Sequence, residues 1–313
     1  MLSLPDSRLG QENQTKALSQ HGYASDLVPE RVVVIGAEGF VGAALVAQLA
    51  AAKISHLGLG RHEIDLLTKG AAELLAAQLR PGDVVVAAAA RAPCRSMAMF
   101  IENMIIVKAI IDALVRVPVS HVINVSSDAV YGDEPAPLTE HAPAAPESLH
   151  GAMHLAREIA FRSEIPTPLA IVRPTLIYGA SDPHNGYGPN RFRRQAARGE
   201  EILLFGEGEE RRDHVLVDDV AALILRIALR RSTGTLNIAT GDTYSFRAIA
   251  EMVVAAARKP LTIKGSPRHG PMPHNGYRPF DPAACHVAFP DFRYVSLPEG
   301  IQRAQTEMEA AFG

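Results

Sequence analysis

The chain has 313 residues, and its 31 Lys and Arg against 34 Asp and Glu give a formal net charge of −3. This balance argues against a generic nucleic-acid-binding protein, which carries a basic excess. Hydrophobic residues make up 47% and charged residues 21%, which excludes disorder, collagen or a coiled coil as the structure of the whole chain.

Cellular context is indicated by the cysteines and by the apolar runs. Two cysteines, Cys94 and Cys285, are too few for a disulfide framework and fit a reducing compartment. No apolar run reaches the roughly 18 residues that a membrane span needs. Residues 1–28 are polar and lack the apolar core of a signal peptide. We therefore expect a flexible N-terminal extension over 1–28 and a cytoplasmic protein that contacts no membrane.

From residue 31 onward, short apolar runs alternate with segments of strong helix formers. The runs predict buried strands at 31–36, 54–60, 83–90, 121–127, 168–179 and 234–240. The intervening segments predict helices at 43–52, 100–117 and 148–163, and 214–231 is typical of a strand that enters a helix. This alternation predicts βαβ units, and so an α/β fold with a doubly wound parallel sheet.

The composition of the sequence changes after Gly179. Residues 181–192 are rich in Gly, Pro and Asn and predict a long loop, and 259–290 is Pro-rich and irregular. We predict a Rossmann-type domain over 29–178, to which 213–240 returns, and a smaller C-terminal domain over 179–313. The pentapeptide PHNGY occurs at 183–187 and again at 273–277. Chance and loop composition explain this repeat, or both loops line one pocket.

A glycine-rich turn lies between the first predicted strand and the first predicted helix. Gly36 permits the tight turn, Gly39 lets the backbone approach a pyrophosphate, and Gly42 lets the helix pack on the strand. The helix N-terminus at Phe40 and Val41 then offers N–H groups and a positive dipole end to the phosphates. The turn therefore predicts a dinucleotide site.

The end of the second strand bears on which dinucleotide binds. NAD sites usually place an acidic residue there, but this chain has Gly60 followed by Arg61. An arginine at this place fits a 2′-phosphate, which favours NADP over NAD; the alternative is that Arg61 is a solvated surface residue. Asp65, expected in the next short strand, either meets the adenine edge or caps the strand end.

Several segments together resemble the extended short-chain dehydrogenase/reductases, the NAD(P)-dependent enzymes that epimerise, dehydrate or reduce sugar nucleotides. The matching features are GAEGFVG at 36–42, Asn103, NVSSDAVYG at 124–132, PLTE at 137–140, RPTLIYG at 173–179, PNRF at 189–192, GEGEERRDHVLVDDVA at 206–221 and GTLNIATG at 234–241. The resemblance implies that a nucleoside-diphosphate sugar binds between the two domains.

The resemblance also implies roles for individual residues. Ser127 matches the catalytic Ser/Thr, and Asp128 lies where dehydratases carry an acid, although Ala129 lacks their glutamate. Arg212 matches an arginine that clamps the substrate pyrophosphate. Leu176 replaces a frequent asparagine, and Asn103 is expected to hold a water near the site. The remaining expected contacts are Ala88, Ala89 and Pro174 with the cofactor, and Cys94, His184, Tyr187, Asn190 and Arg278 with the substrate.

The main departure from the family lies in the helix that normally carries Tyr-x-x-x-Lys. The aligned segment here is His150-Gly151-Ala152-Met153-His154, with well-matched flanks. In the family the tyrosine takes the hydroxyl proton during hydride transfer, while the lysine lowers the tyrosine pKa and holds the ribose. Both residues are replaced by histidines, so the catalytic assignment rests on His150 and His154.

Three hypotheses remain open for this pair. In the first, His150 is the acid/base, although its ring nitrogen reaches roughly 2 Å less far than a tyrosine oxygen. In the second, the hydride chemistry is lost or altered, and the protein is either a regulatory protein that binds cofactor or nucleotide or an enzyme whose acid is Asp128. In the third, the two histidines bind a metal with Cys94, but the pair encloses no glutamate base, and we expect no metal. Two packed histidines without a role are the plainest alternative.

The resemblance also implies a quaternary structure, a homodimer. Family members usually pair two long helices from each subunit in a dimer, and 100–117 and 149–163 are the matching helices here. Their apolar content permits a homodimer, although burial within one subunit explains the same pattern. The sequence thus predicts a cytoplasmic, dimeric NAD(P)-dependent oxidoreductase of a sugar nucleotide, with a non-catalytic binding protein as the alternative.

Overall fold

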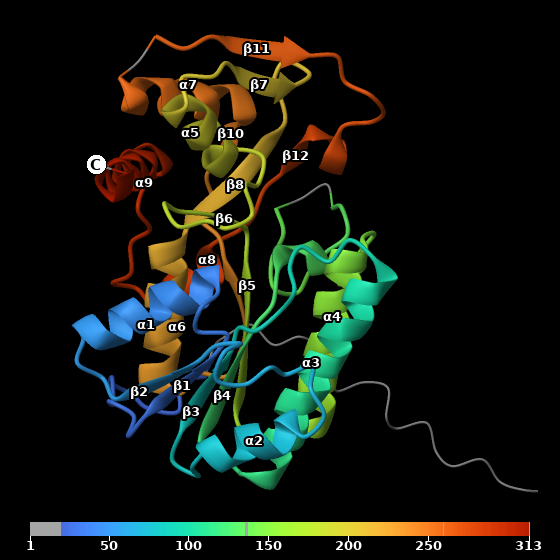
Figure 1. Ribbon diagram of the computed structural model, residues 1–313, viewed down its shortest axis with the longest axis vertical. Helices are drawn as coiled ribbons and strands as arrows, with labels where there is room; N and C mark the ends of the chain where they lie inside the picture. Colours follow the sequence, from blue (N-terminus) through green and yellow to red (C-terminus); the bar gives the residue numbers. More distant parts are fainter. Residues whose placement is uncertain (1–19, 135–136, 259, 313) are drawn as a thin grey trace, which may run out of the picture.

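The computed structural model describes residues 20–134, 137–258 and 260–312. Its centre is a six-stranded, entirely parallel sheet (Figure 1). The strands lie in the order β2 (His56–Leu59), β1 (Val32–Ile35), β3 (Val84–Ala87), β4 (His121–Val125), β5 (Leu169–Pro174) and β9 (Gly234–Ile238). Strands β1 and β3 are continuous apolar runs because both of their faces are buried.

Helices cover both faces of this sheet, as the doubly wound prediction requires. The helices α2 (Ala71–Gln78), α3 (Met97–Arg116) and α4 (Leu149–Glu164) pack on one face. The helices α1 (Phe40–Ala51), α6 (Val217–Arg230) and α8 (Ala283–Ala288) pack on the other face. The strand order reverses between β1 and β3, and a crevice for ligands is expected at the carboxyl ends of these strands.

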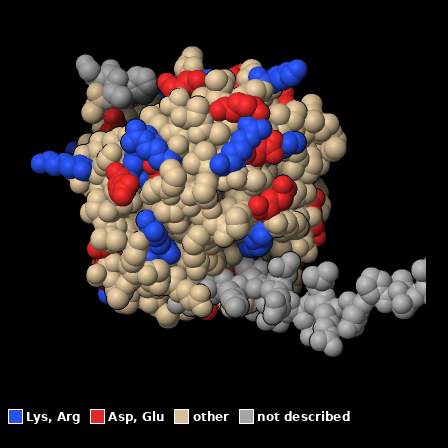
Figure 2. Space-filling model, turned by 90° about the horizontal axis from the view of Figure 1, so that it is seen from below, with Lys and Arg blue, Asp and Glu red and all other residues tan. Residues whose placement is uncertain are grey.

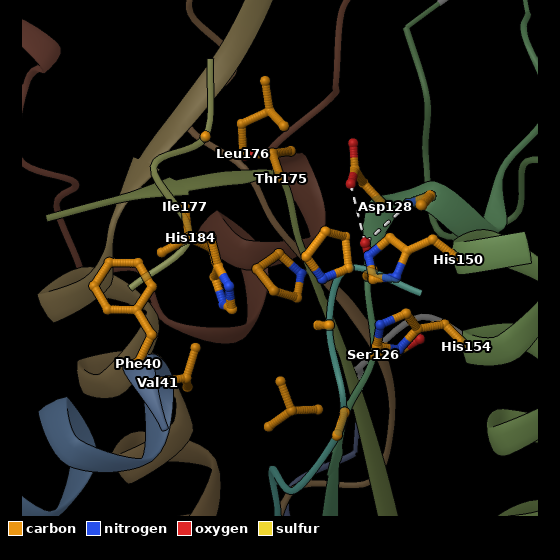
Figure 3. Close-up of a pocket in the computed structure, with 18 of the residues that line it drawn as sticks. Phe40, Val41, Ser126, Asp128, His150, His154, Thr175, Leu176, Ile177 and His184 are labelled. Atoms are coloured by element: carbon orange, nitrogen blue, oxygen red, sulfur yellow. Dashed lines mark hydrogen bonds between the residues drawn. The ribbon is translucent and has the colours of Figure 1, made fainter. Parts of the chain in front are cut away.

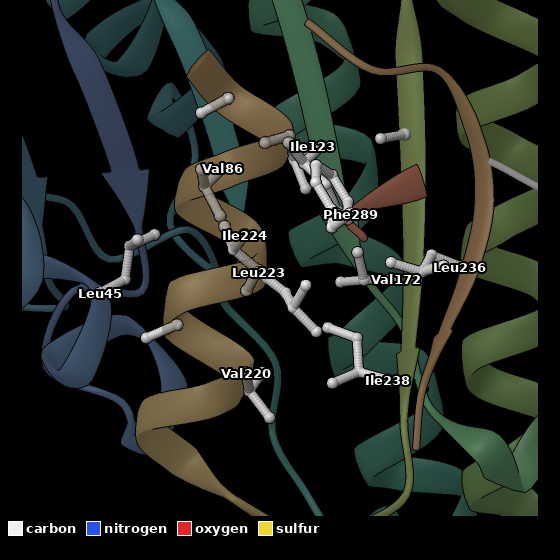
Figure 4. Packing of buried hydrophobic residues seen from close by; sticks show 14 of the residues in the cluster. Leu45, Val86, Ile123, Val172, Val220, Leu223, Ile224, Leu236, Ile238 and Phe289 are labelled. Atoms are coloured by element: carbon white, nitrogen blue, oxygen red, sulfur yellow. The ribbon is translucent and has the colours of Figure 1, made fainter. Parts of the chain in front are cut away.

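The second of these faces shows how the fold is stabilised. Leu223 and Ile224 of α6 pack against Val172, Leu236 and neighbouring strand side chains, all of them buried (Figure 4). Burial of each such leucine or isoleucine side chain contributes about 1.5–3 kcal/mol. This apolar layer holds the strand ends in place beneath the site.

A second region follows β5 and has its own apolar core. Its mixed sheet has the order β10 (Thr243–Ser245), β8 (Arg211–Leu216) and β12 (Tyr277–Arg278), and β6 (Leu176–Tyr178) also pairs with β8. Strands β7 (Ile202–Phe205) and β11 (Ile263–Ser266) form a separate parallel pair. The helices of this region are α5 (Pro189–Ala197), α7 (Phe246–Ala257) and α9 (Leu297–Phe312).

Parts of the sequence interpretation need correction here. The predicted loop over 181–192 ends in helix α5, which begins at Pro189. The stretch predicted to be irregular, 259–290, contains β11, a 3-10 turn (Pro273–Gly276), β12 and α8. Asp65 lies in a turn and not in a strand, because its carboxylate accepts the N–H of Leu67 within that turn.

Part of the expected N-terminal extension lies against the sheet. Gln20 forms a bridge with Thr233, and the His21 ring contacts Ser232 Oγ at 2.7 Å. The N–H of Leu27 donates to the carbonyl of Leu229 at 3.0 Å, so residues 20–28 follow the end of α6. Residues 1–19 lie outside the described residues.

The surface and the helices carry two further observations. On the face seen in Figure 2, acidic and basic side chains lie interspersed, so this face does not present a large field of one sign. Within the described residues, no helix combines the length and the apolar character that crossing a membrane requires.

Candidate active site

A cavity of about 560 Å³ lies at the carboxyl ends of the parallel strands, between the sheet and the second region (Figure 3). Apolar side chains such as Phe40, Val41 and Ile177 form one wall. Its polar lining includes Ser126, Ser127, Asp128, His150, His154, Thr175, Asp182, His184, Asn190, Arg212, His274 and Arg278. Both PHNGY loops contribute to this cavity, through His184 and His274.

The glycine turn borders the cavity and fits a dinucleotide phosphate. Gly36 has φ of +94°, and a Cβ there would lie 2.6 Å from the backbone nitrogen of Ala89. A Cβ on Gly42 would overlap the carbonyl of Gly36. Within the described chain no side chain caps the N-terminus of α1, whose N-cap Gly39 is exposed to the cavity. Free N–H groups and the helix dipole therefore meet an open space, as a pyrophosphate requires.

A second cavity, of about 300 Å³, lies beyond the turn and shares Gly39 and Ala88 with the first. It is lined by the end of β2 and by Ala89 at the end of β3. Arg61 and Asp65 also line it, and the Arg61 side chain donates to Asp65 Oδ2 at 3.1 and 3.2 Å. The two cavities are thus placed to receive the two halves of one extended ligand.

Helix α4 brings the two histidines to the main cavity. Ser148 caps the helix by accepting the N–H of Gly151 at 3.1 Å, so His150 lies in the first turn and His154 in the next. A Cβ on Gly151 would overlap the carbonyl of Ala129, and the glycine therefore lets α4 pack closely on Asp128–Val130. The two rings face each other with centroids 4.7 Å apart and planes at 86°.

Both imidazoles are neutral at pH 7. Burial lowers the pKa of His150, the charge of Asp128 opposes this shift, and His184 adds to it. Burial lowers the pKa of His154 well below its ordinary value, helped by His150 and by Arg157. The backbone N–H of Cys94 donates to His150 Nδ1 at 3.3 Å. Because Nδ1 is an acceptor, the proton of the neutral His150 ring is assigned to Nε2.

Ser127 and Asp128 follow β4, beside the histidines. Ser127 Oγ accepts the N–H of Ala129 at 3.1 Å and donates to Asp128 Oδ1 at 3.2 Å. The other Asp128 oxygen lies 3.8 Å from Arg278 Nε and 4.0 Å from Arg212 Nη2. Two guanidinium groups therefore lie at one end of the cavity, where they can bind an anionic substrate group.

Arg278 is held almost completely buried at this end. Its Nη2 donates to the carbonyls of Asp128 and Tyr131, each at 3.1 Å, and its Nη1 donates to Asp133 at 2.7 Å. His274, from the second PHNGY loop, contacts the same Asp133 carboxylate at 2.5 Å. The guanidinium is thus fixed in place before any ligand binds.

Two buried polar side chains, Arg157 and Asn103, hold the ends of the strands below the site. Arg157 donates to the carbonyls of Ala87 and Ala89, each at 2.7 Å. The amide of Asn103 accepts the N–H of Arg91 at 2.8 Å and donates to the carbonyls of Arg91 and Met99. Its N–H groups and one lone pair of its oxygen are therefore used by backbone groups, and the water that Asn103 is expected to hold stays a prediction.

The structure places most of the predicted site residues at one of the two cavities. Phe40, Val41, Pro174, His184 and Asn190 line the main cavity, and Asn190 also accepts the N–H of Gly179 at 3.2 Å. Tyr187 was expected to contact the substrate, but this prediction is wrong: Tyr187 packs against the apolar core of the second region. Its ring packs against Phe192, Phe205 and Phe246, because the loop turns that side chain into the apolar core of the second region.

Cys94 also departs from its expected place. Its side chain is buried and points to the carbonyl of Ser96, while its neighbours Ala92 and Pro93 line the cavity. Its contribution to the site is its backbone N–H. The described residues contain no cluster of three or more His, Cys, Asp and Glu side chains that could hold a metal ion.

The residues at the two cavities that the sequence analysis missed include Glu38, Ser126 and Thr175. Ser126 and Thr175 follow strands β4 and β5 directly, and their place at a strand end was a signal that was available. Glu38 lies inside the glycine motif, and that motif assigns roles only to its glycines.

The chain is similar to known proteins, both to a family model and to individual relatives. A model of the NAD dependent epimerase/dehydratase family matches residues 32–239. Over 112 residues the chain is 31% identical to the dTDP-4-dehydro-6-deoxy-D-allose reductase of Streptomyces bikiniensis, covering 34% of this chain and 33% of that protein. Over 142 residues it is 30% identical to the UDP-glucose 4-epimerase of Mycolicibacterium smegmatis, covering 43% and 45% respectively. The matched part thus spans a third to somewhat under half of these curated relatives.

Solved structures extend the likeness to the whole fold. The UDP-glucose 4-epimerase of Thermus thermophilus, solved with NAD, superposes with a TM-score of 0.79 at 23% identity, covering 90% of this chain and 99% of that one. A GDP-L-fucose synthetase from Naegleria fowleri bound to NADP gives 0.77 at 16% identity, covering 93% and 97%. At these identities the likeness shows the fold.

The parallel sheet with its glycine turn defines a Rossmann-type α/β protein, and the prediction of that fold is confirmed. Within this class, the chain belongs to the NAD dependent epimerase/dehydratase family, since the family model matches more than half of its length. The resemblance drawn from the sequence motifs is therefore confirmed at the level of the family.

Proposed function

We propose that the chain is a nicotinamide-dependent oxidoreductase of a nucleoside-diphosphate sugar, and that His150 interacts with the reacting oxygen of the sugar. The glycine turn and the second cavity would hold NAD or NADP, and the main cavity would hold the sugar nucleotide. When bound, the reduced nicotinamide would supply a hydride to a carbonyl carbon, and the alkoxide so formed would take its proton from solvent. Relatives named as a reductase and as a 4-epimerase of sugar nucleotides support this substrate class.

The observation that carries the proposal is the hydrogen bond from the Cys94 N–H to His150 Nδ1. It leaves Nε2 as the ring nitrogen that meets a ligand, and it assigns the proton to that nitrogen. A neutral Nε2–H donates a hydrogen bond to a carbonyl oxygen and stabilises the negative charge that develops there. It cannot accept a proton from an alcohol in this tautomer. We therefore favour reduction of a keto sugar among the three reactions of the family.

The other polar groups fit this assignment. Ser127 Oγ offers a second hydrogen-bonding group beside the histidine, and His154 offers a neutral ring to the cofactor ribose. Arg212 and Arg278 would bind the diphosphate of the substrate. Dehydration is less favoured, because Asp128 lies next to both guanidinium groups and its neighbour Ala129 carries no acid.

We also propose that the chain forms a homodimer in the cytoplasm. Met97, Ile101 and Ile105 are exposed on α3 at intervals of four residues, and Ile159 is exposed on the neighbouring α4. Side chains four apart share one face of a helix, so α3 presents an apolar stripe. A second copy that offers the same stripe would cover it in a two-fold dimer.

The test begins with mass spectrometry of the small molecules released when freshly purified protein is denatured. Released or added NAD(P)H, offered with nucleoside-diphosphate 4-keto sugars, should support reduction. His150→Phe should lower kcat roughly 10²- to 10⁴-fold while dinucleotide affinity is retained. His286→Phe, at an exposed histidine of α8, is the matched control. Undiminished turnover in His150→Phe would contradict the assigned role. Dinucleotide binding without turnover of any sugar nucleotide would replace the proposal by the cofactor-binding alternative.

A further inference from the structure

We propose that Glu38, from the glycine turn, is the residue that selects the cofactor, and that it favours NAD over NADP. This inference rests on the proposed function, because it concerns how that site distinguishes two dinucleotides. It replaces the assignment of a 2′-phosphate to Arg61.

The Glu38 carboxylate occupies the place that an acidic residue on β2 would take. Glu38 Oε2 accepts the backbone N–H of Arg61 at 3.2 Å, directly after the end of β2. A Cβ built on Gly60 would lie 2.6 Å from the same Oε2. Gly60 thus leaves room for a carboxylate that arrives from the turn. The sequence therefore lacks the acid at the end of β2, yet the folded protein has a carboxylate there.

This position faces the second cavity. Glu38, Gly60 and Arg61 line it together with Gly36 and Gly39 of the turn. An acidic residue at the end of the second strand of a Rossmann unit hydrogen-bonds the ribose hydroxyls of NAD. The Glu38 oxygens are placed to accept those hydroxyl protons, and the same negative charge repels a 2′-phosphate.

The cationic groups around this cavity are already paired. Arg61 donates to Asp65 with both Nε and Nη2, and Arg91 donates to Glu102 at 2.5 Å. Within the described residues, the Glu38 carboxylate forms no ion pair with the side chain of either arginine. A further carboxylate, Glu63, accepts the N–H of Gly60 at 2.7 Å. Carboxylates therefore outnumber guanidinium groups at this strand end.

Arg61 alone does not restore a phosphate site. Its side chain is 71% exposed, and an exposed ion pair of this kind contributes little, so Arg61 can leave Asp65 at small cost. A 2′-phosphate would nevertheless lie against the Glu38 carboxylate in any orientation of Arg61, because that carboxylate is held at the backbone of the strand end.

The test measures dissociation constants for NADH and NADPH by nicotinamide fluorescence on the intact protein. The wild type should bind NADH roughly tenfold or more tightly than NADPH. Glu38→Ala should weaken NADH binding and bring the ratio close to one, whereas Arg61→Ala should leave the preference for NADH. Glu251→Gln, an exposed carboxylate on α7, is the matched control and should change neither constant.

A rescue separates the position of the carboxylate from a general effect on folding. In the Glu38→Ala background the space beside Gly60 is open, and Gly60→Asp should restore the preference for NADH. A wild-type preference for NADPH that Arg61→Ala abolishes would overturn this inference and leave the proposed function standing. An unchanged ratio of the two dissociation constants in Glu38→Ala would also overturn the inference and leave the proposed function standing. If the protein binds neither dinucleotide, both the inference about Glu38 and the proposed function are overturned.

Discussion

The ring of His154 lies edge-on to the ring of His150, 4.7 Å from it, and both imidazoles are neutral at pH 7. Neither ring can provide the permanent charge that a lysine gives at the second position. His150 Nδ1 accepts the N–H of Cys94, whereas the buried His154 Nδ1 has no hydrogen-bond partner among the described residues. The protonation of His150 depends on the charges around the cavity, of which Asp128 raises its pKa and His184 lowers it.

The first prediction concerns the titration of His150, measured by NMR of its imidazole. The charge of Asp128 raises the pKa of His150, whereas His184 lowers it. Asp128→Asn should therefore move the titration to lower pH, and His184→Gln should move it to higher pH. In an active preparation, the acid limb of the rate profile should follow in the same directions, because the neutral ring is the functional form. Shifts of equal sign in the two variants would contradict this arrangement.

The second prediction concerns the buried pair of Glu158 and Arg173. Arg173 donates to both carboxylate oxygens, at 2.9 and 2.6 Å, and Ser126 Oγ donates at 2.6 Å. Burial would raise the pKa of Glu158, but the hydrogen bond and charge of Arg173 outweigh it and hold the pKa below its usual value. Glu158→Gln should lower the free energy of unfolding by about 3–5 kcal/mol, because it leaves Arg173 buried without a counter-charge.

The control for that measurement is Glu299→Gln, which breaks an exposed pair with Arg303 on α9. Urea unfolding should show a loss of about 1 kcal/mol or less for this variant. Equal losses in the two variants would mean that the buried network is less important to stability than its geometry indicates.

The third prediction concerns acid stability and His121, which is fully buried on β4. Burial lowers its pKa to about 4, while its Nε2 contacts the carbonyl of Ser232 at 2.8 Å. Between pH 6.5 and 4 the unfolded chain binds a proton at this residue and the folded chain does not. The free energy of unfolding therefore falls with decreasing pH, by about 1.4 kcal/mol per pH unit from this group.

Asp213 and Asp219 act in the opposite direction, since burial raises the pKa of each to about 6. The contribution of His121 is therefore isolated by comparing wild type with His121→Gln in urea at several pH values. The variant should be less stable at pH 7, and its stability should depend less steeply on pH below 6.5. Parallel pH curves for the two proteins would show that His121 does not contribute.

The fourth prediction concerns the apolar stripe on α3. Light scattering coupled to size exclusion should give the mass of a dimer for the wild type and of a monomer for the double variant Ile101→Glu/Ile105→Glu. Leu74→Glu, at an exposed leucine of α2, is the matched control and should remain dimeric. A monomeric wild type would rule out the proposed assembly.

The sheet was predictable from the sequence because strands that are buried on both faces consist of consecutive apolar residues. Strands β1 and β3 gave this signal without help from distant residues. Strands β11 and β12 did not, because their partners are β7 and β8, more than fifty residues earlier in the chain. Their short, polar sequences acquire a strand conformation only through pairing with those distant segments.

The site was predictable to the extent that motifs place residues at strand ends. The glycine turn follows β1 and Ser127 follows β4, and both lie at the cavities for that reason. His150 and His154 reach the main cavity from helix α4 instead, where the family motif placed them. Glu38 was not predictable in this way, since its carboxylate reaches β2 only once the turn has folded. Tyr187 was misplaced because the sequence of a loop does not say which of its side chains turns inward.

The carboxylate of Asp213 on β8 contacts two of the segments that connect the parallel sheet with the second region. It accepts hydrogen bonds from Thr175, where the chain leaves β5, and from the N–H groups of Thr240 and Gly241, where it leaves β9. Moving the second region away from the parallel sheet would break these bonds. Asp213 therefore resists displacement of the second region relative to the parallel sheet.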